Sequence, residues 1–190
     1  VRFAYDYTKA LLESGKNVVT SNKELVAKHG DEFFEIARKN NVRYLYEASV
    51  GGGIPIIRPI ANDIAANDIT EIAGILNGTT NYILTKMFGE NQSFETALKT
   101  AQELGYAEKD PTADVDGIDA CRKIAILMSL ATSKKVDSEE IYTKGIRNLT
   151  EEDVAYAAAL NCTIKLVGMG SIENGKVSAS VSPMLIEKSC

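Results

Sequence analysis

The chain has 190 residues, of which 45% are hydrophobic and 25% charged, a composition typical of a globular protein with a substantial core. Its formal net charge is -5 and it contains no basic stripe, so no nucleic-acid partner is expected. No apolar stretch reaches the roughly 18 to 20 residues of a membrane-spanning helix, so no membrane partner is expected either. Three widely spaced cysteines and one histidine argue against a zinc or iron centre and favour a reducing, cytoplasmic location.

The first part of the chain alternates between helical and extended patterns. The expected elements are a helix ending at Gly15, a strand over 17–20, a helix entered through Ser21 to Lys23, a helix capped by Asp31, and a strand over 42–50. This order predicts the C-terminal tail of a doubly wound parallel α/β domain, with a domain boundary near Tyr46.

The rest of the chain mixes helices with a few strands. The expected elements are helices over about 55–66, 79–87, 94–104, 118–132, 138–146 and 151–161, a strand over 69–76, and a hairpin of 163–171 with 176–186. Ser93 and Thr150 have the positions of helix caps, and Asn174-Gly175 has the composition of a hairpin turn. We therefore expect an α+β domain with a mixed sheet over residues 46–190.

The densest group of ionisable residues lies between Gly105 and Lys123. A solvated acidic loop is the plain interpretation. A calcium loop is excluded because its register would place Thr112 and Lys123 where acidic ligands are needed. Asp119 and Lys123 are four residues apart on a predicted helix and share one face. They form either a surface ion pair or a proton donor beside a carboxylate that orients a substrate, and the spacing does not decide between the two.

Two further segments also allow a structural and a functional interpretation. Gly51 to Gly53 follow a strand and precede a helix without forming GxGxxG. They make either a tight turn or a loop whose carbonyls could hold a hard monovalent cation. Lys23 follows the end of a strand, where it is either an exposed helix-start residue or a lysine that meets a phosphate or a reacting group.

Four consecutive segments resemble the signature blocks of the homoserine dehydrogenase family. They are GKNVVTSNK (15–23), YEASVGGGIPII (46–57), GILNGTTNYIL (74–84) and GYAEKDPTADVDGIDACRK (105–123). Their order and spacing agree with the family over essentially the whole chain. The resemblance implies an oxidoreductase that uses NADP or NAD to interconvert aspartate semialdehyde and homoserine in threonine, methionine and isoleucine biosynthesis. Which of the two nucleotides it prefers stays open.

The resemblance also implies roles for single residues. Lys123 is similar to the proton donor to the carbonyl oxygen, and Lys23 to a catalytic lysine near the nicotinamide. Glu108 and Asp119 resemble substrate-binding carboxylates, and Gly105 matches a cofactor-contacting position. A sodium ion in the family is held mainly by backbone oxygens, and the matching positions here are Glu47, Val50, Gly52 and Ile54.

The family couples a nucleotide-binding domain to a catalytic domain that forms a homodimer. GxGxxG is absent here, so residues 1–45 are expected to be the C-terminal part of the first domain, and 46–190 the second, truncated at its C-terminal end. Such a fragment is expected to be inactive alone. One alternative is a non-catalytic oligomerisation fragment of a related two-domain oxidoreductase. Another is aspartate-semialdehyde dehydrogenase, but its cysteine nucleophile needs a base, and His29 is remote from Cys121 in the sequence.

Overall fold

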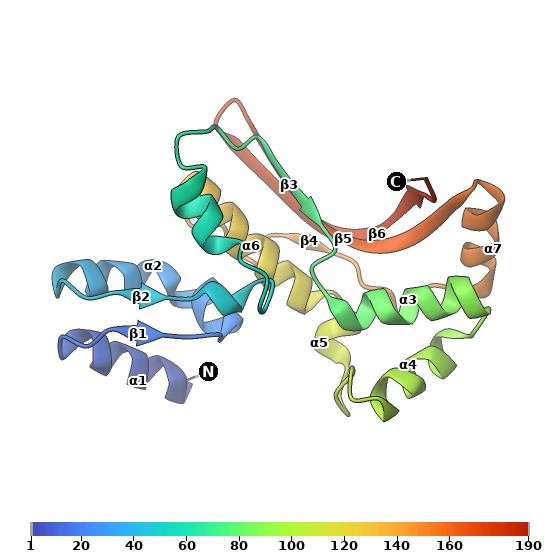
Figure 1. The fold of residues 1–190 in the computed structure, drawn as a ribbon, viewed down its shortest axis with the longest axis horizontal. Helices are drawn as coiled ribbons and strands as arrows, with labels where there is room; N and C mark the ends of the chain where they lie inside the picture. The colour runs from blue at the N-terminus through green and yellow to red at the C-terminus, as the bar shows by residue number, and fades with distance from the viewer. Residues whose placement is uncertain (1, 190) are drawn as a thin grey trace. The chain divides into compact units, whose positions relative to one another are not determined.

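The computed structural model describes residues 2–189, which divide into two compact units (Figure 1). The first unit contains the chain up to Thr70 together with Arg122–Glu140 and Ile172–Val177; the second contains Glu71–Cys121, Ile141–Ser171 and the chain from Ser178 onward. No helix within residues 2–189 is long and apolar enough to cross a membrane. The domain boundary expected near Tyr46 is not tested by this division and stays a prediction.

The first unit is built on a pair of parallel strands joined by a helix. Its elements are α1 (Arg2–Glu13), β1 (Val18–Val19), α2 (Lys23–Lys39), β2 (Tyr44–Leu45), a 3-10 turn (Glu47–Ser49), a π-helical turn (Pro59–Asp63) and most of α6 (Ile118–Thr132). Val18 pairs with Tyr44 in parallel register, as the sequence predicted. Helices α1 and α2 contact each other, and Leu12, Leu25 and Phe33 on these helices are buried.

The sequence predicted two helices after Ser21, but the structure has a single helix, α2, in their place. Helix α2 continues through Gly30, and its cap is Asn22, whose side chain accepts a hydrogen bond from the backbone of Leu25, rather than Asp31. A glycine inside a helix costs only about 1 kcal/mol relative to alanine. Burial of Phe33 and Ala37 on the next turn offsets that cost, since a buried phenylalanine alone contributes ~1.5–3 kcal/mol.

The second unit contains a mixed sheet and several helices, which confirms the expected α+β character. Its elements are β3 (Glu71–Gly74), α3 (Gly78–Glu90), α4 (Phe94–Glu103), α5 (Thr112–Val115), β4 (Tyr142–Thr143), α7 (Glu151–Ala159), and most of β5 (Cys162–Glu173) and β6 (Lys176–Glu187). The strand order is β3-β5-β6-β4, with β3 antiparallel to β5 and β4 parallel to β6. The β5–β6 hairpin turns at Asn174 and Gly175, both with φ near +50° to +75°, as predicted.

The helix expected over 138–146 does not form. That segment contains β4 instead, and the backbone amide of Lys144 donates to the carbonyl of Val181 on β6. Gly145 allows this segment to approach another backbone closely, because a Cβ at this position would lie 2.1 Å from the carbonyl oxygen of Val115. The segment therefore lies backbone to backbone against the end of α5, a contact that a helix with side chains on every face could not make.

Candidate active site

A buried amide joins two carboxylates in the second unit. The Nδ2 of Asn77 donates to Oδ1 of Asp114 at 2.7 Å and to Oδ2 of Asp119 at 2.9 Å. Asn77 and Asp119 are 5% and 7% exposed, and Thr80, whose amide donates to Oδ1 of Asn77 at 2.8 Å, is fully buried. Two sequence segments that are far apart, NGTT and the acidic loop, thus meet in one polar cluster.

Local helix ends bring this cluster together. Asn77 is the N-cap of α3. Gly105 follows the C-cap of α4, and its φ of +78° allows the amide of Tyr106 to turn back and donate to the carbonyl of Ala101. The hydroxyl of Thr79 then donates to the carbonyl of Tyr106 at 2.7 Å. As a result, the first turn of α3 lies against the loop that carries Gly105.

Glu108 lies in the same loop but on its exposed side. The side-chain amide of Gln102 in α4 donates to the Glu108 carbonyl at 3.1 Å and so holds the backbone there. Gly105 is also exposed, and a Cβ added to it would meet no heavy atom of the described residues within 4 Å. Both positions predicted from the sequence are therefore open to an incoming molecule.

Residues 146 and 147 hold the C-terminal end of the acidic loop. Arg147 donates to both carboxylate oxygens of Asp116, from Nε at 2.8 Å and from Nη2 at 3.1 Å. The Ile146 amide donates to the Val115 carbonyl at 2.8 Å, beside the close approach of Gly145. Such backbone and bidentate contacts fix the loop that leads into α6.

The two predicted lysines both belong to the first unit and are half-buried. Lys23 is the first residue of α2 and directly follows the loop after β1. Its neighbour Glu24 accepts a 2.9 Å ion pair from Arg122, which is the neighbour of Lys123 on α6. The start of α2 and the middle of α6 are thereby tied together at the residues adjacent to the two lysines.

Helix α6 carries both Asp119 and Lys123. They are four residues apart in one continuous helix, so they lie on the same face, as the sequence predicted. Asp119 is almost fully buried and already engaged by Asn77, which is not expected of an exposed surface ion pair. The role of Lys123 as a proton donor beside this carboxylate stays a prediction.

The loop of Gly51 to Gly53, in the first unit, makes close contacts within its own backbone. Gly51 and Gly52 have φ of +76° and +59°, and a Cβ at Gly51 would lie 2.7 Å from the carbonyl oxygen of Ile54. The carboxylate of Glu47 accepts hydrogen bonds from the amides of Ile56, Ile57 and Arg58 at 2.7 to 2.9 Å. Burial opposes its charge, but the three amide donors together lower the pKa of the Glu47 carboxyl.

Asn77 and Asp114 are not predicted from the sequence as members of this cluster. An asparagine directly before a helix has the position of an N-cap, and that signal could have identified Asn77. Nothing in the spacing of Asn77 and Asp119, which are 42 residues apart, indicates that they meet.

Comparison with known proteins identifies one family. Residues 55–190 match the family model described as homoserine dehydrogenase. The chain is 46% identical over 180 residues to a homoserine dehydrogenase of Bacillus subtilis (strain 168), an alignment that covers 95% of this chain and 42% of the relative.

Solved structures give the same result. The fold is similar to that of a homoserine dehydrogenase from Thiobacillus denitrificans, with a TM-score of 0.95, 44% identity, and coverage of 98% of this chain and 43% of that one. A hyperthermophilic archaeal homoserine dehydrogenase in complex with NADPH gives a TM-score of 0.86 at 33% identity, covering 99% and 54% of the two chains. The chain thus spans less than half the length of the Bacillus and Thiobacillus proteins, and with its motifs, its fold and these matches it belongs to the homoserine dehydrogenase family.

Proposed function

We propose that this chain provides the substrate-binding and proton-transfer part of an NAD(P)-dependent enzyme that interconverts aspartate semialdehyde and homoserine. The observation that carries the proposal is the cluster in which Asn77 joins Asp114 to the buried Asp119 at the base of α6, one turn before Lys123. Burying a carboxylate is costly unless it is paired or hydrogen-bonded, and the negative charge held here suits the ammonium group of an amino-acid substrate.

In this proposal the carboxylates and the lysines have different roles, which follow from their opposite charges. Asp119 and Glu108 would bind the substrate ammonium, whereas the Lys123 ammonium would stabilise the negative charge that grows on the carbonyl oxygen and donate a proton to it. Lys23 would lie near the reacting centre, since ligands of parallel α/β units bind beyond the carboxyl ends of the strands. A bound nicotinamide would supply or accept the hydride.

The nucleotide would contact Lys23 and Gly105. Gly105 fits because an added Cβ would face open space, which lets a ligand approach its backbone. The parallel β1–β2 pair with α2 between them supports the view that residues 1–45 are the tail of a doubly wound nucleotide-binding domain. The chain lacks the GxGxxG that normally binds the pyrophosphate.

A sodium ion near the loop of Gly51 to Gly53 is a further cofactor proposal. The backbone oxygens of Glu47, Val50, Gly52 and Ile54 would bind it, and the inward-folded Ile54 carbonyl is compatible with that role. Hard cations prefer such oxygen ligands. No group of three or more His, Cys, Asp or Glu that could hold a metal occurs among residues 2–189. Stoichiometric zinc in elemental analysis would contradict the proposal.

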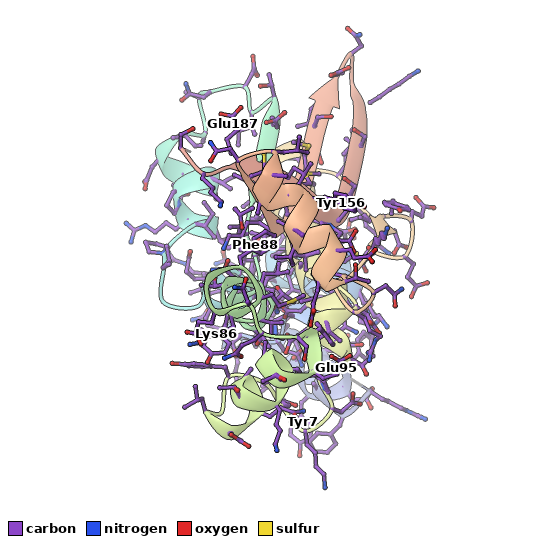
Figure 2. The ribbon with its side chains drawn as sticks, turned by 90° about the vertical axis from the view of Figure 1, so that its right-hand side faces the viewer. Tyr7, Lys86, Phe88, Glu95, Tyr156 and Glu187 are labelled. Atoms are coloured by element: carbon purple, nitrogen blue, oxygen red, sulfur yellow. The ribbon has the colours of Figure 1, made fainter. Side chains whose placement is uncertain are left out.

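We further propose a homodimer in the cytoplasm. Exposed apolar side chains lie on the second unit at Tyr142 (63% exposed), Tyr156 (70%) and Leu185 (53%), and Figure 2 shows Tyr156 on α7. The free thiols of Cys121 and Cys162 suit a reducing compartment.

The test is turnover by the complete natural polypeptide that carries this sequence. Homoserine with NADP or NAD should give a rise in absorbance from the reduced nicotinamide, and aspartate semialdehyde should give the reverse. Absence of turnover in both directions by the folded polypeptide would reject the proposal. It would then favour the non-catalytic oligomerisation role.

A further inference from the structure

We infer that Asn77 is a positioning residue that sets the orientation of Asp119 and Asp114 for the substrate ammonium. The inference rests on the function proposed above and adds a residue to it. Asn77 acts through the two carboxylates.

The hydrogen-bonding capacity of Asn77 is fully used. A side-chain amide has two protons, and those of Asn77 go to Asp114 and Asp119 at 2.7 and 2.9 Å. Its oxygen accepts from the amide of Thr80 at 2.8 Å and from the Thr80 hydroxyl at 3.0 Å. A flipped amide would turn its oxygen toward two carboxylates and its protons toward an N–H, so the network permits one orientation.

An uncharged donor is the group that this position requires. Two carboxylates that share one donor repel each other, and loss of the donor would favour protonation of one of them. A lysine or arginine in this place would satisfy both but would also neutralise their charge. The asparagine amide donates to both carboxylates without adding a positive charge of its own.

Burial makes these contacts energetically important. Asn77 and Asp119 are at least nine-tenths buried and Thr80 is completely buried, so water cannot replace a lost partner at little cost. The same amide oxygen caps α3, which couples the carboxylates to the first turn of that helix. Asn77 thereby sets both the charge and the place of the ammonium site relative to α3.

Two variants separate positioning from capping. Asn77→Ser keeps a good helix cap but has no amide to donate to both carboxylates, and Asn77→Asp keeps the cap and adds a third negative charge. In the complete natural polypeptide we expect kcat/KM for homoserine to fall about 10- to 100-fold in Asn77→Ser, the range typical of groups that support a functional residue. The fall should be larger in Asn77→Asp at neutral pH, and the KM for the nucleotide should stay near the parent value.

The matched control is Ser93→Ala, which removes the cap of α4, whose Oγ accepts from Thr96. It should lower the melting temperature and leave kcat/KM unchanged. A folded Asn77→Ser protein with kcat/KM within two-fold of the parent would overturn the inference. So would a loss of activity that merely follows the melting temperature across all three variants.

A second measurement does not depend on activity. Carboxyl carbon NMR should report a higher pKa for Asp119 in Asn77→Ser than in the parent, because a donor to its charged form is lost. An unchanged Asp119 titration would overturn the inference. If the parent shows no turnover with homoserine, the proposed function fails, and this titration alone decides whether Asn77 holds the carboxylate.

Discussion

Lys123 is the residue on which the proposed chemistry most directly depends. General acid catalysis typically contributes about 100- to 10,000-fold, so Lys123→Met in the complete natural polypeptide should lower kcat by roughly that factor, or about 3 to 5 kcal/mol in barrier terms. Lys123→Arg should also fail, because a guanidinium holds its proton too tightly to act as an acid. The measurements are kcat at saturating aspartate semialdehyde and the melting temperature. Near-normal kcat in a folded Lys123→Met protein would remove Lys123 from the mechanism.

The lowered pKa of Glu47 leads to a prediction about how the free energy of unfolding depends on pH. Its pKa lies below the ordinary value of 4.5, so its contribution to stability is complete above that value and is lost as pH falls through the folded pKa. Glu47→Gln should therefore lower the free energy of unfolding by ~1–2 kcal/mol at pH 7, the range of a lost cap. The difference from the parent should vanish in acid.

Denaturant unfolding at pH 7 and near pH 3 measures this difference. Glu35→Gln is the control, because the Glu35 side chain is 64% exposed and lies 4.0 Å from the Lys39 ammonium in a surface ion pair. It should be nearly neutral at both pH values. A Glu47→Gln effect of equal size at both pH values would show that its charge does not matter.

At the scale of single residues, the sequence predicted the carboxylate and lysine of α6 but not their environment. Side chains four residues apart in a helix share a face regardless of how the helix packs, so Asp119 and Lys123 could be placed together from their spacing alone. Asn77 could not be joined to Asp119, because their contact depends on how α3 and α6 pack. Packing of this kind leaves no local signal in the chain.

Among the elements, the contact between Gly145 and the end of α5 is the most demanding. A methyl group at Gly145 would lie 2.1 Å from the Val115 oxygen and 2.4 Å from the Asp116 Cα, both of which are backbone atoms that cannot rotate away. Gly145→Ala should destabilise the protein by about 3 kcal/mol or more, at the upper end of overpacking costs. It should also disturb the Asp116–Arg147 contact beside it.

Gly89→Ala is the matched control. Gly89 lies in the last turn of α3, and an added Cβ would meet no heavy atom of the described residues within 4 Å. It should stabilise the protein by ~0.5–1 kcal/mol, because alanine favours helix over glycine. Thermal unfolding of both variants tests the pair, and similar melting temperatures would show that the 144–146 segment can move away from α5.

Elements with strong local signals were predicted well. The capping box of Thr150 and Asp153 begins α7, and Asn174-Gly175 turns the long hairpin, as expected. The predictions failed where tertiary contacts outweigh local preference. Helix α2 continues through Gly30, and the 138–146 segment joins the sheet as β4 instead of coiling.

At the scale of the whole molecule, assembly can be tested with the 190-residue chain itself. The exposed apolar side chains of Tyr142, Tyr156 and Leu185 belong to the second unit, through which we propose that the homodimer forms. Sedimentation equilibrium at micromolar concentration should therefore give twice the 20.6 kDa of one chain. A Leu185→Lys variant should shift the equilibrium toward the monomer, whereas Phe3→Lys, on α1 of the first unit, should not. A single 20.6 kDa species at all concentrations would contradict the homodimer.

The 190-residue chain is expected to bind nucleotide weakly, because it contains no GxGxxG. A pyrophosphate normally binds to the amides of a glycine-rich loop at a helix N-terminus, and that loop supplies much of the affinity. Residues 1–190 retain Lys23 and Gly105 but no GxGxxG, so calorimetry with NADPH should detect weak binding or none, and turnover should be negligible. The complete natural polypeptide is the control and should bind with ordinary affinity. Micromolar NADPH binding by the 190-residue chain, lost in Lys23→Ala, would show that this half of the site is sufficient.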